Sequence, residues 1–232
     1  MRKEIIILGA IVVVVVIAAI LGSNYYQNSV QNDRKTAISN VNNSNKPKPD
    51  AAQLVRPDSP MIGPEDAKVT LVEFYDPECE ACAEFGPIIK KILKDYEGRI
   101  RYVARLMPLH PNSMTAATFI EAAGEQGKYW QAQELLFEKQ PEWATKHGTP
   151  PDPSAPSINE LFDKYAKELG LDTNKAAESV KDKRFDAKIE RDKKDGQSLG
   201  VRRTPTFLVN GRELVNFGEP GLRQLIDEEL KK

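Results

Sequence analysis

Apolar and polar residues divide the chain into three stretches with different patterns. Residues 5–21 form an uninterrupted apolar run that follows two basic residues. The next stretch, up to residue 57, is dominated by Asn, Ser, Gln, Lys and Pro, and its scattered apolar residues cannot support a core. From residue 58 onward, apolar positions recur with the periods of strands and helices. The pattern predicts one globular domain behind a tether and a hydrophobic N-terminal segment.

The apolar run is at the short end of the length that spans a bilayer. A cleavable signal peptide remains an alternative, but bulky Ile20 and Leu21 stand near its candidate cleavage sites, which favours an uncleaved anchor. No charge follows the run until Asp33, so the positive-inside rule places the N-terminus in the cytoplasm. The predicted segments are a cytoplasmic N-terminus at 1–4, a transmembrane helix at 5–22, a flexible linker at 23–57 and an extracytoplasmic domain at 58–232.

Strand patterns stand at both ends of the globular part, with helical patterns between them. Residues 69–75 are rich in β-branched and aromatic side chains and end at Asp76 and Pro77, as a buried strand does before a turn. The turn Asn210-Gly211 is typical of a tight hairpin. A helical block over about 113–199 separates a β-α-β half from a β-β-α half, which predicts an α/β fold. The other expected elements are a helix at 80–96, strands at 99–106, 206–209 and 212–216, and a helix at 222–230.

Charge and composition exclude one class of partner. The chain has 33 basic and 34 acidic residues, so it has no net positive field of the kind that draws proteins onto nucleic acid. Hydrophobic residues make up 40% of the chain, which is enough for a proper core. We therefore expect no nucleic-acid partner.

The chain has only two cysteines, Cys79 and Cys82, and two residues separate them. They cannot form the disulfide framework of a small secreted domain, so they are a site or a coincidence. Zinc ligands usually come in close pairs, but His110 and His147 lie 37 residues apart, and we predict no metal. We interpret His110 as a surface-loop histidine.

The cysteine pair lies where a strand passes into a helix. Cys79 is therefore expected beside the helix N-terminus, where unpaired amides favour a thiolate. The helix end contributes roughly 0.3–1 kcal/mol, less than the 1.36 kcal/mol or so of one pKa unit, so further donors are needed. Cys82, one helical turn later, is placed to attack a mixed disulfide. A lone C-x-x-C is also compatible with a metal half-site or an inert pair.

Glu73 lies six residues before Cys79, in a strand that otherwise has the pattern of a core strand. A carboxyl group in such surroundings has a raised pKa and is able to accept the proton of Cys82. The alternative is that Glu73 points to solvent or pairs with a lysine. Near the other end of the domain, Thr204-Pro205 comes directly before the last hairpin, where a proline can take either isomer.

Three segments together resemble the DsbA-like branch of the thioredoxin superfamily, particularly its membrane-anchored bacterial members. They are GPEDAKV at 63–69, VEFYDPECEAC at 72–82 and TPTFLVNG at 204–211. Their order and spacing are specific, and the resemblance covers most of the chain from Pro60 onward. It implies a thioredoxin-like fold with an inserted helical domain.

The resemblance also implies roles for individual residues. Cys79 would be the nucleophile, Cys82 the resolving cysteine and Glu73 the buried proton acceptor. Pro205 would be a cis proline beside the sulfurs, where it presents the backbone of Thr204 to an extended client peptide. The implied reaction is thiol-disulfide exchange with client proteins outside the cytoplasm, without a bound cofactor, and a membrane redox partner would restore the working state.

The direction of exchange depends on the residues between the cysteines. Family oxidants often carry a proline and a histidine there, whereas this chain has Glu80 and Ala81. A negative Glu80 disfavours the thiolate of Cys79, which predicts a disulfide of intermediate oxidising strength. We expect an oxidant. The alternatives are a reductase or isomerase of the same fold, or a non-catalytic peptide-binding module.

Overall fold

The computed structural model describes residues 22–24, 26–28, 51–145, 148 and 154–232. The chain divides into two compact units, Met1–Pro47 and Lys48–Lys232. Residues 5–21 of the expected transmembrane helix and 29–50 of the expected linker lie outside the described residues. Among the helices that are described, none combines the length and apolar character needed to cross a bilayer.

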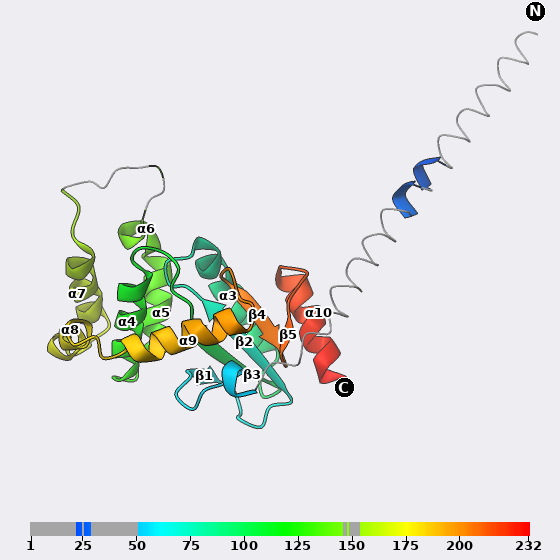
Figure 1. Cartoon of the computed structure of the whole chain (residues 1–232), viewed down its shortest axis with the longest axis horizontal. Coiled ribbons are helices and arrows are strands. Elements are labelled where there is room, and N and C mark those ends of the chain that lie inside the picture. The colour runs from blue at the N-terminus through cyan, green and yellow to red at the C-terminus, as the bar shows by residue number, and fades with distance from the viewer. Residues whose placement is uncertain (1–21, 25, 29–50, 146–147, 149–153) are drawn as a thin grey trace, which may run out of the picture. The chain divides into compact units, whose positions relative to one another are not determined.

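The second unit contains the expected β-α-β half, helical block and β-β-α half (Figure 1). Two of the predicted strands, at residues 69–75 and 206–209, have the expected bounds. In chain order the elements are α2 (Ala51–Leu54), β1 (Met61–Ile62), β2 (Val69–Tyr75), α3 (Glu80–Asp95), β3 (Ile100–Leu106), α4 (Ser113–Gly124), α5 (Tyr129–Glu138), α6 (Gln140–Trp143), α7 (Ile158–Glu168), α8 (Thr173–Lys181), α9 (Asp186–Ser198), β4 (Thr206–Val209), β5 (Arg212–Glu213) and α10 (Glu219–Leu230).

The five strands form one sheet in the order β1-β3-β2-β4-β5. The central pair, β2 and β3, is parallel, and the other pairs are antiparallel. The parallel pair is joined through α3, as a crossover between parallel strands requires. The cysteines lie at the start of this crossover, directly beyond the carboxyl end of β2.

Side chains of β2 and β3 alternate between two cores on opposite faces of the sheet. Leu71 and Tyr75 of β2 belong to the larger core, together with residues of α3, α10 and the helical block. Val72 and Phe74 point the other way, into a smaller core beneath α9 and α2. Since Glu73 has the same parity as Leu71 and Tyr75, its side chain lies on the α3 side of the sheet.

The compact unit begins before residue 58, where we expected the linker to end. Helix α2 packs against α9, and Leu54 is only 8% exposed. The sequence pattern hides this because the helix has only four residues, too few to show an apolar period, and polar contacts add to the burial of Leu54. The last hairpin also differs from expectation: its second strand stops at Glu213 instead of continuing to residue 216, and α10 begins earlier, at Glu219.

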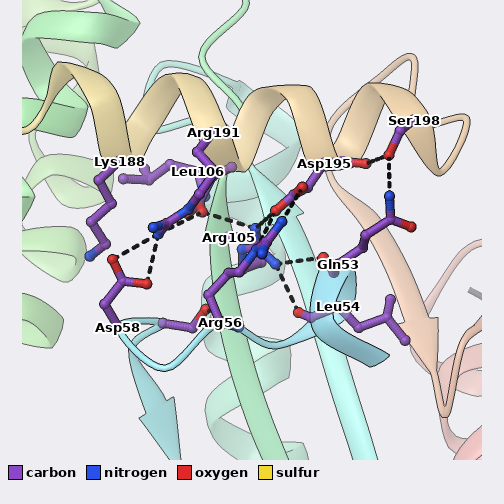
Figure 2. Close-up of polar contacts among 12 residues, drawn as sticks. Gln53, Leu54, Arg56, Asp58, Arg105, Leu106, Lys188, Arg191, Asp195 and Ser198 are labelled. Atoms are coloured by element: carbon purple, nitrogen blue, oxygen red, sulfur yellow. Dashed lines mark hydrogen bonds and ion pairs between the residues drawn. The ribbon is translucent and has the colours of Figure 1, made fainter. Parts of the chain in front are cut away.

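A buried arginine on β3 connects α2 and α9 to the sheet (Figure 2). The side chain of Arg105 is 0% exposed and pairs with Asp192 at 2.9 Å and Asp195 at 2.6 Å, both on α9. It also donates to the carbonyl oxygens of Gln53 and Leu54 in α2. Buried charges of this kind are tolerated only when paired and hydrogen-bonded, so Arg105 requires both helices to stay in place.

Replacing Arg105 with Met is expected to lower the free energy of unfolding by about 3–5 kcal/mol, because buried Asp192 loses its nearest cation and Asp195 is left with its pair to Arg56. Urea unfolding of the two proteins measures the difference. The matched control is Lys90→Met, which removes a cation from an exposed pair with Glu134 and should cost less than about 1 kcal/mol. Equal losses in the two variants would contradict a structural role for Arg105.

Candidate active site

The two cysteines occupy different environments at the start of α3. Cys79 is the N-cap residue of the helix, and Cys82 lies in its first turn. Both are free thiols. Cys79 is 8% exposed, whereas Cys82 is 1% exposed. A molecule approaching from solvent therefore meets the sulfur of Cys79 first.

Hydrogen-bond donors around Cys79 stabilise its thiolate. The pKa of Cys79 is lowered to about 6, first by a hydrogen bond from the Cys82 thiol and then by the Thr204 side chain and the backbone amides of Cys82 and Ala81. Burial acts in the opposite direction but does not prevail. The amides are those of the first helical turn, where no intrahelical acceptor is available. The Cys82 thiol and the Thr204 side chain are the additional donors that the sequence required beyond the helix end.

The segment that precedes β4 lies against Cys79. The Thr204–Pro205 peptide bond is cis, and Pro205 is buried. The thiol of Cys79 lies 3.3 Å from the carbonyl oxygen of Thr204 and donates to it. The structure thus brings together two residues that are 125 positions apart in sequence.

Cys82 and Glu73 lie in the larger core beneath Cys79. Burial, the bond to the Cys79 sulfur and the negative charge of Glu73 hold the pKa of Cys82 well above its ordinary value. Glu73 is 4% exposed, so the solvent-facing alternative is wrong. Burial raises the pKa of Glu73 to about 7, although the hydroxyl of Tyr102 donates to its Oε2 and opposes this shift. A carboxyl group that titrates near neutral pH therefore lies within electrostatic reach of the second sulfur.

The loop between β2 and α3 is tied to the helical block. Gln140 of α6 is buried and donates from Nε2 to the carbonyl oxygens of Pro77, at 2.8 Å, and Cys79, at 3.1 Å. The carboxylate of Asp76 accepts from the backbone amide of Glu78 at 2.8 Å. These contacts hold the backbone on both sides of the first cysteine, so the insertion helps to position the site.

The structure shows Glu80 and His110 in different surroundings. Glu80 is exposed at the first position of α3. His110 is not a simple surface histidine, because its Nδ1 lies 2.7 Å from Oδ2 of the fully buried Asp76. His147 lies outside the described residues. In the described part of the chain, no group of three or more His, Cys, Asp or Glu side chains is arranged to hold a metal ion.

The structure brings five of the six sequence-predicted residues into one site and leaves Glu80 at its exposed edge. Residues that sequence patterns did not identify are Tyr102, Asp76, His110 and Gln140. For Asp76, its place between a buried strand and Pro77 was an available signal. The contact of Gln140 with the loop had no sequence signal, because it depends on how α6 packs.

Known proteins resemble this chain in sequence and in fold. The family model described as thioredoxin matches residues 56–228. Disulfide bond formation protein D of Bacillus subtilis is 30% identical over 183 residues, which cover 74% of this chain and 77% of that protein. The crystal structure of oxidised BdbD from Bacillus subtilis superposes with a TM-score of 0.66 at 27% identity, covering 80% of this chain and 97% of that one.

Longer proteins also contain a related segment. The Na⁺/H⁺ antiporter NhaA 3 of Salinispora tropica is 37% identical over 162 residues, or 68% of this chain. This chain spans only 22% of the length of that antiporter. The Bacillus subtilis relative is named for disulfide bond formation, and a structural neighbour from Silicibacter pomeroyi, 26% identical with a TM-score of 0.64, is described as a thioredoxin-like oxidoreductase. The chain therefore belongs to the thioredoxin family, and its residues 56–228 form a thiol-disulfide oxidoreductase domain of the DsbA type.

Proposed function

We propose that this protein donates disulfides to client proteins outside the cytoplasm, with Cys79 as the nucleophilic cysteine and Cys82 as the resolving cysteine. The opposite pKa shifts of the two thiols carry this proposal. Cys79, with a pKa of about 6, is mostly thiolate at neutral pH, while Cys82 stays protonated and buried. A stable Cys79 thiolate favours the reduced form of the protein, which makes its disulfide a better oxidant.

Exchange with a client proceeds in two steps that conserve electrons and protons. A client thiolate attacks the Cys79 sulfur of the Cys79–Cys82 disulfide, and Cys82 departs and takes up a proton. A second client thiolate then attacks the client sulfur of the mixed disulfide and releases Cys79 as a thiolate. The client gains one disulfide, and the two electrons remain on the cysteine pair.

Reoxidation forms the Cys79–Cys82 disulfide again, and in this step Glu73 acts as the proton acceptor. The Cys79 thiolate attacks a disulfide of the redox partner and forms a mixed disulfide with it. Cys82 must then lose its proton before it attacks the Cys79 sulfur and releases the partner. Glu73 accepts this proton, since its carboxyl group lies in the same core and titrates near pH 7.

Thr204 and Pro205 form the surface on which the client segment lies. The Thr204 carbonyl already accepts a hydrogen bond from the Cys79 thiol, so the backbone at this position is directly beside the reacting sulfur. An extended client peptide that pairs with this backbone would bring its own cysteine to Cys79. Glu80 modulates the site from its exposed edge, where its negative charge opposes the thiolate.

The location and partners are part of the same proposal. The apolar run at 5–21 with basic residues before it supports a single-pass membrane anchor with the catalytic domain outside the cytoplasm. Clients are then exported proteins with pairs of thiols, and the regenerating partner is a membrane protein that carries a disulfide. No bound cofactor is needed, because all electrons pass between sulfur atoms.

A reductase or isomerase of the same fold is the second candidate, favoured by Glu80 and by the absence of a histidine between the cysteines. It would use the same residues but deliver the dithiol instead of the disulfide. The non-catalytic peptide-binding module has less support, because it gives no reason for opposite pKa shifts in the two thiols.

Replacing Cys82 with Ala should trap the protein in mixed disulfides with exported clients and with its membrane partner, because no second thiol remains to resolve them. Non-reducing electrophoresis of cells treated with acid to quench thiols measures the trapped species. The double variant that also has Cys79→Ala is the control and should trap nothing. An absence of mixed disulfides, or trapping of cytoplasmic proteins only, would contradict the proposed reaction or the proposed location.

Glu73→Gln should slow the attack of Cys82 on the mixed disulfide by roughly 10- to 100-fold, near the lower end of general base catalysis. In the unchanged protein this rate should rise as the pH passes through about 7, because Glu73 becomes a carboxylate. Stopped-flow reoxidation by glutathione disulfide measures the step.

Stability provides an independent check on the same variant. A carboxyl group whose folded pKa is raised binds its proton more tightly when folded, so stability is lost as the pH rises from about 4.5 to about 7. Glu73→Gln should therefore be more stable than the unchanged protein at pH 8, by on the order of 2–3 kcal/mol, and not at pH 4. Glu84→Gln, an exposed change on α3, is the control. If Glu73→Gln and the control behave alike, Glu73 is not the proton acceptor.

A further inference from the structure

Asp76 connects the cysteine loop to the segment that follows β3. Its side chain is fully buried, and its Oδ2 accepts from the backbone amides of Leu109, at 2.7 Å, and His110, at 3.2 Å. Its Oδ1 accepts from the hydroxyl of Ser113. The backbone carbonyl of the same residue accepts from the amide of Cys79 at 3.1 Å. One residue thus joins the 109–113 segment to the backbone of the nucleophilic cysteine.

Glu78 makes a second connection between the same two segments. Its carboxylate is 5% exposed and accepts from the backbone amide of Asn112 at 2.6 Å and from the hydroxyl of Ser113 at 3.3 Å. The other oxygen accepts from the amide of Thr145, which follows α6, at 2.7 Å. The 109–113 segment is therefore fixed along the loop that carries Cys79 and is not a free surface loop.

The His110 side chain is held in one orientation by these contacts. Its Nδ1 lies 2.7 Å from Oδ2 of Asp76, and the side chain is 32% exposed. Within the described residues, no hydrogen bond is recorded for Nε2, so this nitrogen is available to carry or release a proton. A carboxylate that fixes one ring nitrogen and stabilises the imidazolium is a common arrangement beside catalytic nucleophiles.

Among the described residues, the charges with the largest effect on His110 are negative. They are Asp76 at the end of β2, and Glu78 and the Cys79 thiolate in the loop before α3. Burial lowers the pKa of His110, but the hydrogen bond and charge of Asp76 outweigh it, and the charges of Cys79 and Glu78 add to the rise. The imidazolium is thus favoured beside Asp76, whose backbone carbonyl accepts from the amide of Cys79.

We propose that His110, oriented by Asp76, is a positioning residue whose positive charge stabilises the Cys79 thiolate and strengthens the Cys79–Cys82 disulfide as an oxidant. This inference rests on the proposed function. A lower pKa of the leaving thiol makes release of Cys79 from the mixed disulfide faster. His110 also opposes Glu80, the negative residue that directly follows Cys79, so the two residues set the oxidising strength together.

The effect must depend on pH in a defined direction. His110 carries its charge below its own pKa, which is above the ordinary value for histidine, and loses it as the pH rises through that pKa. Its support for the thiolate is therefore largest between the Cys79 pKa of about 6 and the His110 pKa, and disappears in more alkaline solution. A residue that only held the loop in place would have the same effect at every pH in this range.

His110→Gln in the full-length protein tests the inference. The pKa of Cys79, followed by thiolate absorbance near 240 nm, should rise. At a pH between the Cys79 pKa of about 6 and the His110 pKa, the equilibrium constant for oxidation of glutathione by the protein should fall roughly two- to fivefold, as expected for a partly exposed charge pair. Above that pKa the difference from the unchanged protein should vanish. His110→Lys should restore the lost oxidising strength both below and above the His110 pKa, because the lysine keeps its charge over this range.

Lys181→Gln is the matched control, since it removes one exposed cation from α8, a helix that packs against α4 and α7. This variant should change neither the pKa of Cys79 nor the equilibrium constant for oxidation of glutathione. If His110→Gln has the same Cys79 pKa and equilibrium constant as the unchanged protein, or differs equally at all pH values, the inference is wrong. If the unchanged protein itself shows an ordinary Cys79 pKa and exchanges no disulfides, the proposed function fails instead.

Discussion

The rest of the site depends on where α3 begins relative to the two cysteines. The helix starts at Glu80, so Cys79 caps it from outside while Cys82 is one turn inside and faces the sheet. The first sulfur is therefore surrounded by amide donors that favour its thiolate, and the second is surrounded by apolar side chains that favour its thiol. This difference in environment separates the two chemical roles. It also explains why a single pair of cysteines is able to form, hold and resolve a mixed disulfide.

The strand beneath the helix adds a second constraint. Glu73 has the parity that points it toward α3, and a carboxylate buried there destabilises the fold above its pKa. Tyr102 of β3, whose register partner on β2 is Leu71, limits this cost with one hydrogen bond to Glu73. Arg105, on the opposite face of the same strand, is balanced by two carboxylates of α9. The sheet thus carries a carboxyl group with a pKa of about 7 on the catalytic side and a buried cation paired with two carboxylates on the structural side.

The sequence predicted those features that depend on local patterns. Strand β2, the start of α3 and the cysteine pair follow from β-branched residues, helical spacing and the Asp76-Pro77 turn. Alternation alone could not decide the direction of Glu73, because every side chain in β2 except Thr70 is buried. The contact of His110 with Asp76 and that of Gln140 with the loop join residues 34 or more positions apart, so they depend on tertiary packing. Helix α2 was missed for the same reason, since its carbonyl groups, not its apolar pattern, bind it to Arg105.

The reduction potential of the Cys79–Cys82 pair tests the central claim, that the site stabilises the Cys79 thiolate and so donates disulfides. Equilibration of the full-length protein in graded glutathione buffers measures it. The account predicts a value between roughly −180 and −120 mV, the range of disulfide donors. A value near about −270 mV would be that of a reductant and would contradict it.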